Sequence, residues 1–199
     1  MNESFMSQIT PDTLMTLEAY AKMRKEFRTK VIEHKKNRTV HLDEHITLLF
    51  EDELTIRYQV QEMLRIEKIF EEEGIQGELD AYNPLVPDGS NFKATMFIEY
   101  DDIEERKKAL AKLKGVEDQV WLQVAGCERV YAIADEDLDR ENEEKTSSVH
   151  FLRFELTPAM KAALKNRIGL AAGVDHPAYQ TTIPALPDEI RAALLADLA

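Results

Sequence analysis

Every second side chain from Phe92 to Tyr100 is apolar, and this alternation predicts a β-strand with one buried face. Residues 120–125 and 128–134 form two further runs, and the Gly126-Cys127 pair between them is typical of a β-hairpin turn. Since the two strands of a hairpin are antiparallel, we expect a mainly antiparallel sheet of four to five strands.

The segment from Val149 to Leu156 predicts another strand, with His150, Leu152 and Phe154 on one face. The preceding segment, from Asp135 to Ser148, is acidic and nearly devoid of apolar residues. Such a composition predicts an exposed connection. Its carboxylate spacing resembles a calcium loop, but it lacks the central glycine that such a loop needs, so calcium binding is not expected.

Two long helices are expected in the first part of the chain. Thr10-Pro11-Asp12 is a strong start signal, because threonine caps a helix, proline fits its first turn and aspartate favours its positive end. This helix should run to about Lys36. A second helical pattern begins near Asp52 and should end at Gly74, directly after the glutamates at 71–73.

Residues 75–91 contain several turn signals, among them Asn83-Pro84, and predict a long loop. This loop would separate a helical N-terminal part, residues 1–74, from an α/β part, residues 75–199, within one compact domain. The hairpin and the uneven order of strands and helices favour the α+β class over a doubly wound α/β fold. We therefore expect a long N-terminal helix and a second helix packed with the antiparallel sheet.

The charge of the chain narrows its range of partners. Its 199 residues include 38 acidic and 25 basic side chains, for a formal net charge of −13. Such a surface repels nucleic acids and anionic membranes, so neither is an expected partner. The chain begins without a basic and apolar leader, and no apolar run approaches the ~18 residues of a membrane helix. A cytoplasmic protein is expected.

Common catalytic signatures are absent from the sequence. It contains no phosphate-binding loop, no dinucleotide fingerprint, no serine-hydrolase elbow and no His-Glu-x-x-His motif. The single cysteine, Cys127, excludes a disulfide within the chain and an iron–sulfur cluster with cysteine ligands. The sequence therefore names no reaction.

One region departs from the acidic composition. The first predicted helix carries a basic face, which consists of Lys22, Arg24, Lys25, Arg28, Lys30, Lys35, Lys36 and, just past the helix end, Arg38. This face either is solvated and pairs with acidic neighbours, or docks an acidic partner or a phosphate-bearing ligand.

His41 and His45 are four residues apart, which places both on one side of either a strand or a helix. Glu51, Glu62 or His176 would complete a metal site, since imidazole and carboxylate suit zinc, iron or manganese. A transition metal at His41 and His45 is one hypothesis for a cofactor. A half-buried histidine pair without metal is the structural alternative.

Tyr58, Glu62 and Arg65 fall near one face of the second predicted helix, with Gln61 beside them. Glu62 and Arg65 are three residues apart, so they either pair with each other or take part in binding. An arginine and glutamine row would suit a carboxylate or phosphate group of a ligand or partner. These four residues form the first candidate binding site.

Asp175 and His176 form a second candidate site near the C-terminus. The proline after His176 forces it into an extended conformation. Histidine exchanges protons near neutral pH, and a neighbouring aspartate would orient its ring. The pair is therefore a ligand-binding or catalytic candidate, with a rigid turn as the structural alternative.

Three blocks of the sequence together resemble a bacterial family catalogued as domain of unknown function 3501. They are HLDEHITLLFEDELTIRYQVQEMLRIEKI, YNPLVPDGSNFKATMFIEYDD, and GVDHPAY followed by LPDEIRAALLADL. They span most of the chain from about Met15 onward, and none is a catalytic signature. The resemblance implies a redox or oxidative-stress setting, with a rubrerythrin-like protein or an iron–sulfur oxidoreductase as partner.

Two functions are weighed on these grounds. The charge asymmetry and the missing catalytic signatures favour an accessory protein that docks onto a redox enzyme through the basic helix and the Tyr58–Arg65 face. The alternative is a metal- or anion-dependent enzyme in which five side chains converge, namely His41, His45, Glu62, Arg65 and His176. A second copy of the chain is a further partner to consider.

Overall fold

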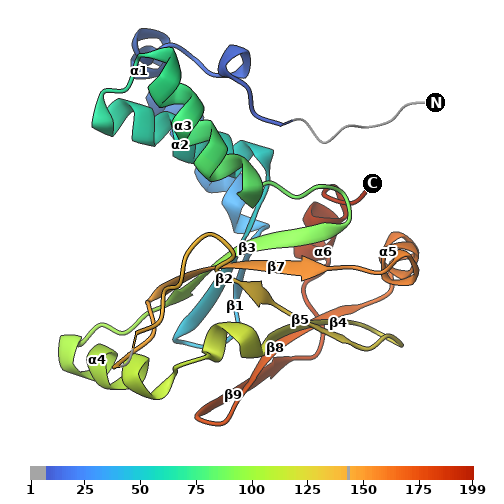
Figure 1. The fold of residues 1–199 in the computed structure, drawn as a ribbon. Coiled ribbons are helices and arrows are strands. Elements are labelled where there is room, and N and C mark those ends of the chain that lie inside the picture. Colours follow the sequence, from blue (N-terminus) through green and yellow to red (C-terminus); the bar gives the residue numbers. More distant parts are fainter. Residues whose placement is uncertain (1–7, 143) are drawn as a thin grey trace.

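The computed structural model describes residues 8–142 and 144–199, and it confirms the α+β class (Figure 1). The described α-helices are α1 (Leu17–Lys36), α2 (Glu53–Glu67), α3 (Glu72–Tyr82), α4 (Ile103–Lys112), α5 (Pro158–Lys165) and α6 (Asp188–Leu195). Three short 3-10 helices are η1 (Pro11–Thr13), η2 (Asn83–Leu85) and η3 (Val116–Gln119). The strands are β1 (Thr39–His41), β2 (Ile46–Glu51), β3 (Asn91–Ile98), β4 (Val120–Val124), β5 (Arg129–Tyr131), β6 (Ile133–Ala134), β7 (Val149–Glu155), β8 (Leu170–His176) and β9 (Tyr179–Ile183).

The strands form two antiparallel sheets, where the sequence predicted one. One sheet has the order β1-β2-β3-β7-β6 and the other β5-β4-β8-β9. The predicted hairpin at Gly126-Cys127 is confirmed by the pairing of β4 with β5. Its returning strand is then divided, because β6 leaves β5 and pairs with β7 in the other sheet. Between β5 and β6 the chain therefore passes from the four-stranded sheet to the five-stranded sheet.

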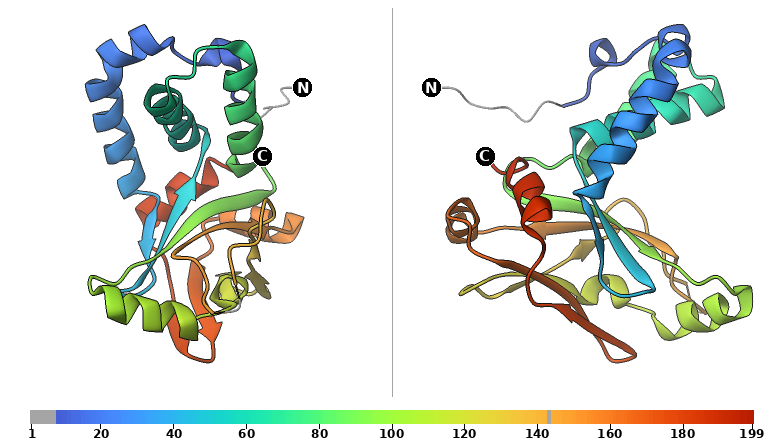
Figure 2. Two further views of the ribbon diagram at one scale, coloured as in Figure 1. Left: turned by 60° about the vertical axis from the view of Figure 1, so that its left-hand side comes forward. Right: turned by 180° about the vertical axis from the view of Figure 1, so that it is seen from behind.

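The described residues form two hydrophobic cores. The larger core contains one face of the five-stranded sheet, residues of the four-stranded sheet, and side chains from α4, α5 and α6. The smaller core belongs to the helices and includes Ile56, Val60 and Leu64 of α2 and Leu79 of α3. Figures 1 and 2 show α1, α2 and α3 as a layer beyond the five-stranded sheet. The division into two parts near residue 74 stays a prediction.

The first helix is shorter than predicted. Thr10-Pro11-Asp12 starts only the 3-10 turn η1, and α1 begins at Leu17 after a second cap. The side chain of that cap, Thr16, accepts a hydrogen bond from the N–H of Ala19 at 3.2 Å. The start signal was correctly recognised, but its helix stops after one turn.

The boundary between the second helix and the predicted loop was wrong. Helix α2 ends at Glu67, and its cap, Lys68, has a left-handed backbone with φ 54°. Glu72 and Glu73 then occupy the first turn of α3, where negative charge is stabilised by the helix dipole. Much of the expected loop is therefore helical, and Gly74 lies inside that helix rather than at an end.

The alternation in β3 and β7 separates two environments. Phe92, Ala94 and Met96 are buried in the larger core, whereas Lys93 points to the opposite side of the sheet, toward α3 and η2. In β7, His150 and Leu152 are buried in the same direction as Phe92. The period of two correctly predicted the core-facing side of β3 and β7. It also places polar side chains of both strands on the other side of the sheet, which faces the helices.

Arg38 ties the end of α1 to the C-terminal helix. Its guanidinium donates to both carboxylate oxygens of Asp197, at 2.9 and 2.6 Å, and its Nε lies 2.9 Å from Asp52 Oδ2. Its exposed fraction is 2%, so its assignment to a solvent-facing basic surface was wrong. Helix α6 and the residue Asp197 after it, which are far away in the sequence, bury the Arg38 side chain.

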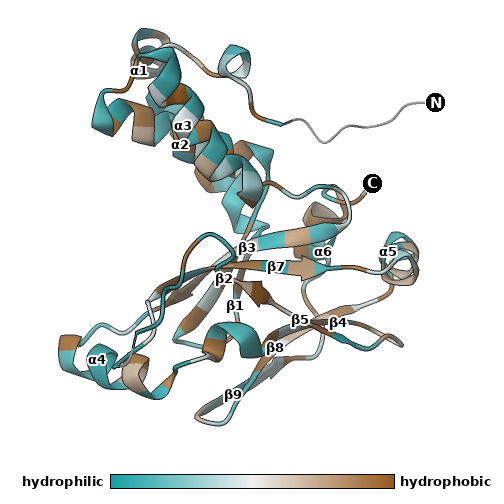
Figure 3. Cartoon of the chain, in the orientation of Figure 1, coloured by the Kyte–Doolittle hydropathy of each residue, from teal (hydrophilic) through white to brown (hydrophobic). Residues whose placement is uncertain are grey.

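The colouring by hydropathy in Figure 3 shows mixed hydrophilic and hydrophobic residues along α1, α2 and α3. Among the described helices, none combines the length and apolar character needed to cross a membrane.

Candidate functional site

His41 and His45, the two histidines predicted to share a metal, contact different residues. His41 is exposed, and its Nδ1 lies 3.0 Å from Thr47 Oγ1. His45 stacks on Tyr100 with ring centroids 3.9 Å apart, and its Nδ1 lies 3.0 Å from the carbonyl oxygen of Glu99. Within the described residues, neither belongs to a group of three ligating side chains. The hypothesis of a metal at His41 and His45 therefore gains no support.

Three of the four candidate residues of α2 contact α1 or the segment just before it, so they do not form a free binding surface. Gln61 is fully buried and holds the backbone of Met15, accepting from its N–H at 2.6 Å and donating to its carbonyl at 3.3 Å. The ring of Tyr58 packs against Phe27, with centroids 6.0 Å apart. Only Arg65 is exposed.

Glu62 is the centre of a polar cluster between α1 and α2. It accepts hydrogen bonds from Arg24 at 2.7 and 2.8 Å, from the Tyr20 hydroxyl at 2.6 Å and from Arg65 at 3.3 Å. These donors, Arg24 first, lower the pKa of Glu62 to about 2. The ionised carboxylate therefore stabilises the packing of the two helices.

The Glu62→Gln variant is expected to lower the free energy of unfolding at pH 7 by about 1 kcal/mol, because charge-assisted hydrogen bonds at a partly exposed site are lost. In the folded protein the pKa of Glu62 lies below its unfolded value of 4.5, so its contribution is complete above about pH 4.5 and is lost as the pH falls through 2. Urea unfolding of the variant and of the unmodified protein at pH 3 and pH 7 measures the loss of stability and its dependence on pH. An equal loss at the two pH values would contradict this assignment.

Asp175 and His176 point away from each other along β8. Asp175 accepts hydrogen bonds from Arg129 and from the Tyr131 hydroxyl, both on β5, which is separated from β8 by β4. His176 is buried, with Nε2 3.0 Å from the carbonyl oxygen of Lys114 and Nδ1 accepting from the N–H of Ala178 at 3.2 Å. The aspartate does not orient the imidazole, whose contacts match those of a structural turn.

A pocket lies where the helical layer meets the five-stranded sheet. It has a volume of about 820 Å³, with α3 and η2 on one side, β3 and β7 on the other, and residues 136–140 at its edge. That volume suits a small organic ligand. Its apolar walls come from Tyr82, Pro84, Leu85, Val86 and Phe151. No sequence pattern predicted this pocket, because its two sides meet only in the tertiary structure.

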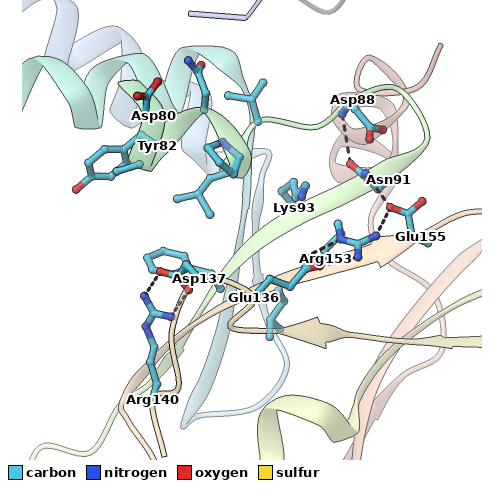
Figure 4. A pocket seen from close by; sticks show the side chains of 17 residues that line it. Asp80, Tyr82, Asp88, Asn91, Lys93, Glu136, Asp137, Arg140, Arg153 and Glu155 are labelled. Atoms are coloured by element: carbon cyan, nitrogen blue, oxygen red, sulfur yellow. Dashed lines mark hydrogen bonds and ion pairs between the residues drawn. The ribbon is translucent and has the colours of Figure 1, made fainter. Parts of the chain in front are cut away.

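Lys93 lies in this pocket and is half-buried (Figure 4). Among the described residues its ammonium group has neither a hydrogen bond nor an ion pair, while burial, followed by the charge of Arg153, lowers its pKa. The other two cations of the pocket are paired: Arg153 with Glu136 and Glu155, and Arg140 with Asp137. Lys93 is thus the cation of the pocket that is left for a ligand.

A second polar group lies on the opposite side of β7 and is buried in the protein. Glu117, Asp135 and His150 each place a ligating atom within 4.8 Å of the others. The alternation of β7 correctly predicted the buried face of His150. No sequence signal predicted its partners, because Asp135 was assigned to an exposed acidic connection.

The match to the family described as Protein of unknown function (DUF3501) covers residues 8–198. A similar solved structure is the crystal structure of a novel protein of unknown function from Burkholderia pseudomallei K96243. Its sequence is 57% identical, the TM-score is 0.93, and the alignment covers 97% of this chain and 100% of that one. No curated protein matches the sequence. Because the family match spans nearly the whole chain, the protein belongs to the DUF3501 family of proteins of unknown function.

Proposed function

We propose that this protein is a cytoplasmic accessory protein that binds a small organic carboxylate in the pocket between α3, η2, β3 and β7. The proposal rests on one observation: Lys93 is a half-buried cation that forms no ion pair with any described residue. An unpaired charge in a partly buried position weakens folding, and a bound anion would offset this cost.

The surroundings of Lys93 suit an anion that carries an apolar body. Figure 4 shows Lys93 between the segment that carries Tyr82 and the Arg153–Glu155 pair. The ligand's carboxylate would pair with Lys93, and its apolar part would contact the walls formed by η2 and Phe151. The carboxylates of the pocket that pair with arginine are already neutralised locally, so they oppose the ligand less than their number suggests.

Lys93→Met is expected to weaken the binding of small carboxylates at least about tenfold, because it removes the charge and keeps most of the side-chain volume. The same change should leave the free energy of unfolding unchanged or raise it, since it removes an unpaired, partly buried cation. Phenylacetate and 3-phenylpropionate, with the corresponding amides as neutral probes, provide the measurement by calorimetry and by NMR shifts.

Lys112→Met, on the exposed side of α4, is the matched control and should bind as the unmodified protein does. Lys93→Arg should retain part of the affinity because it keeps the positive charge. Equal binding of acids and amides, or equal binding by Lys93→Met and the unmodified protein, would refute the carboxylate site.

The outer face of α1 supports the docking of an acidic partner as a second role. Lys25, Arg28 and Lys30 are exposed and form no ion pair with any described residue. In contrast, Arg24 and Lys35 contact α2. The proposed docking surface therefore consists of Lys25, Arg28 and Lys30. The redox identity of the partner, a rubrerythrin-like protein or an iron–sulfur oxidoreductase, comes from the family resemblance.

Charge reversal at Lys25, Arg28 and Lys30 tests this second role. Capture of an acidic redox protein by the unmodified protein should be strong at low salt and weak at about 0.5 M salt, because the Debye length then falls to a few ångströms. The triple glutamate variant should capture none at either salt concentration. Capture by this variant at low salt would exclude the surface.

A further inference from the structure

We propose that Glu117 and His150 bind a divalent first-row transition metal, with Asp135 holding the histidine ring. Their ligating atoms lie within 4.8 Å of one another. The site lies on the core side of β7, whereas Lys93 lies on the other side of the sheet. The inference is therefore independent of the carboxylate pocket.

Both ring nitrogens of His150 have polar partners. Its side chain is fully buried. Nδ1 lies 2.6 Å from Asp135 Oδ2, and Nε2 lies 3.0 Å from the carbonyl oxygen of Ser147. A carbonyl oxygen only accepts hydrogen bonds, and so does an ionised carboxylate. Nε2 also lies 3.0 Å from the Thr146 hydroxyl. A metal ion at Nε2 would bind these surrounding oxygens together with the nitrogen.

Glu117 is the negative ligand on the Nε2 side. Its Oε2 lies 3.9 Å from Nε2 of His150, and its exposed fraction is 7%. The Thr146 hydroxyl lies 3.3 and 3.4 Å from its two oxygens, and a hydroxyl has a single proton to donate. No described lysine or arginine forms an ion pair with Glu117. Burial raises the pKa of this carboxyl group, and the charges of Glu141 and Asp118 add to the effect.

Asp135 is a positioning residue. One of its oxygens accepts from the N–H of Phe151 at 2.9 Å and from Arg140 at 3.2 Å, and the other faces Nδ1 of His150. Its backbone has φ 48°, in the left-handed region that is strained for a residue other than glycine. A carboxylate that holds the far nitrogen of a metal-binding histidine fixes the ring and raises its basicity.

The distances suit zinc or a similar ion. Metal–nitrogen and metal–oxygen bonds of about 2.0–2.2 Å require that two ligand atoms of one ion lie within about 4.3 Å. Glu117 Oε2 and the Ser147 carbonyl oxygen meet this limit relative to Nε2, and so does Thr146 Oγ1 at 3.0 Å. A nitrogen with oxygen ligands favours zinc, manganese or iron(II) over calcium.

The untagged full-length protein, stripped with a chelator and dialysed against Zn²⁺, is expected to retain about one equivalent by mass spectrometry. Glu117→Gln and His150→Gln should each reduce this to below about 0.1 equivalent, and Asp135→Asn should weaken the affinity by about 10–100-fold. Co²⁺ should give visible absorption bands in the unmodified protein and none in Glu117→Gln.

His41→Gln is the matched control, because it removes an exposed histidine and should retain the full equivalent. Glu117→Gln should stay folded, since it removes a buried charge without breaking an ion pair to lysine or arginine. Circular dichroism verifies this. The site is excluded if the unmodified protein retains no Zn²⁺, or if Glu117→Gln retains as much as His41→Gln does.

Discussion

Replacing Arg38 with methionine is expected to lower the free energy of unfolding by about 3–5 kcal/mol, the cost of leaving a buried charge without its partner. Asp197 is 3% exposed and receives two hydrogen bonds from Arg38. Burial raises the pKa of Asp197 despite these bonds. Without the guanidinium, the carboxylate would lack its principal donors, and α6 would lose its attachment to the end of α1.

The loss should depend on pH. A protonated Asp197 needs no cationic partner, so the difference between Arg38→Met and the unmodified protein should shrink as the pH falls from 7 to 4. Urea unfolding followed by circular dichroism measures both values. Lys22→Met is the control, because the exposed pair with Glu18 should contribute less than about 0.5 kcal/mol. A loss of similar size in the two variants would show that the buried pair is unimportant.

Replacing Gly173 with alanine is expected to cost about 3 kcal/mol, because the added methyl group has no space. Gly173 lies in β8 opposite Trp121 of β4. A Cβ atom there would lie 2.7 Å from Cε2 of Trp121 and would also overlap the carbonyl oxygen of Thr181. The ring cannot move aside easily, since it is 1% exposed and Arg129 stacks on it at 3.9 Å.

Gly169→Ala is the matched control in the turn before β8. Apart from its two chain neighbours, no described residue has a heavy atom within 4 Å of a Cβ built on Gly169. This variant should keep its stability or gain up to about 1 kcal/mol through a less flexible unfolded chain. Fluorescence of the single tryptophan, Trp121, reports both transitions. Equal stability of the two alanine variants would show that the sheet adapts around Gly173.

Local patterns predicted the individual strands and the start of several elements. The alternation of residues 92–100 and 149–156 correctly placed Phe92 and His150 on a buried face, because a period of two depends only on the extended backbone. The hairpin at Gly126-Cys127 was also predicted, since its turn and its two strands are neighbours in the sequence. Sequence alone did not predict two sheets, because the transfer from β5 to β6 depends on distant partners.

The predicted site residues show the limit of local patterns. Glu62 and Arg65 do pair, but Arg24 of another helix is the stronger partner, and Gln61 is used to hold Met15. Periodicity identifies the residues that share a face, but it does not predict which other segments that face contacts. The pocket at Lys93 and the buried group at His150 were therefore beyond its reach.

The sequence by itself determined the α+β class, the family, the strand faces and the local basicity of α1, because each depends on neighbouring residues or on composition. Only the tertiary structure decided that Arg38 is buried, that Lys93 has no ion-pair partner among the described residues, and that Asp135 lies against His150. The reason is physical: burial and charge pairing depend on segments that approach through packing, and this packing is set by the whole chain.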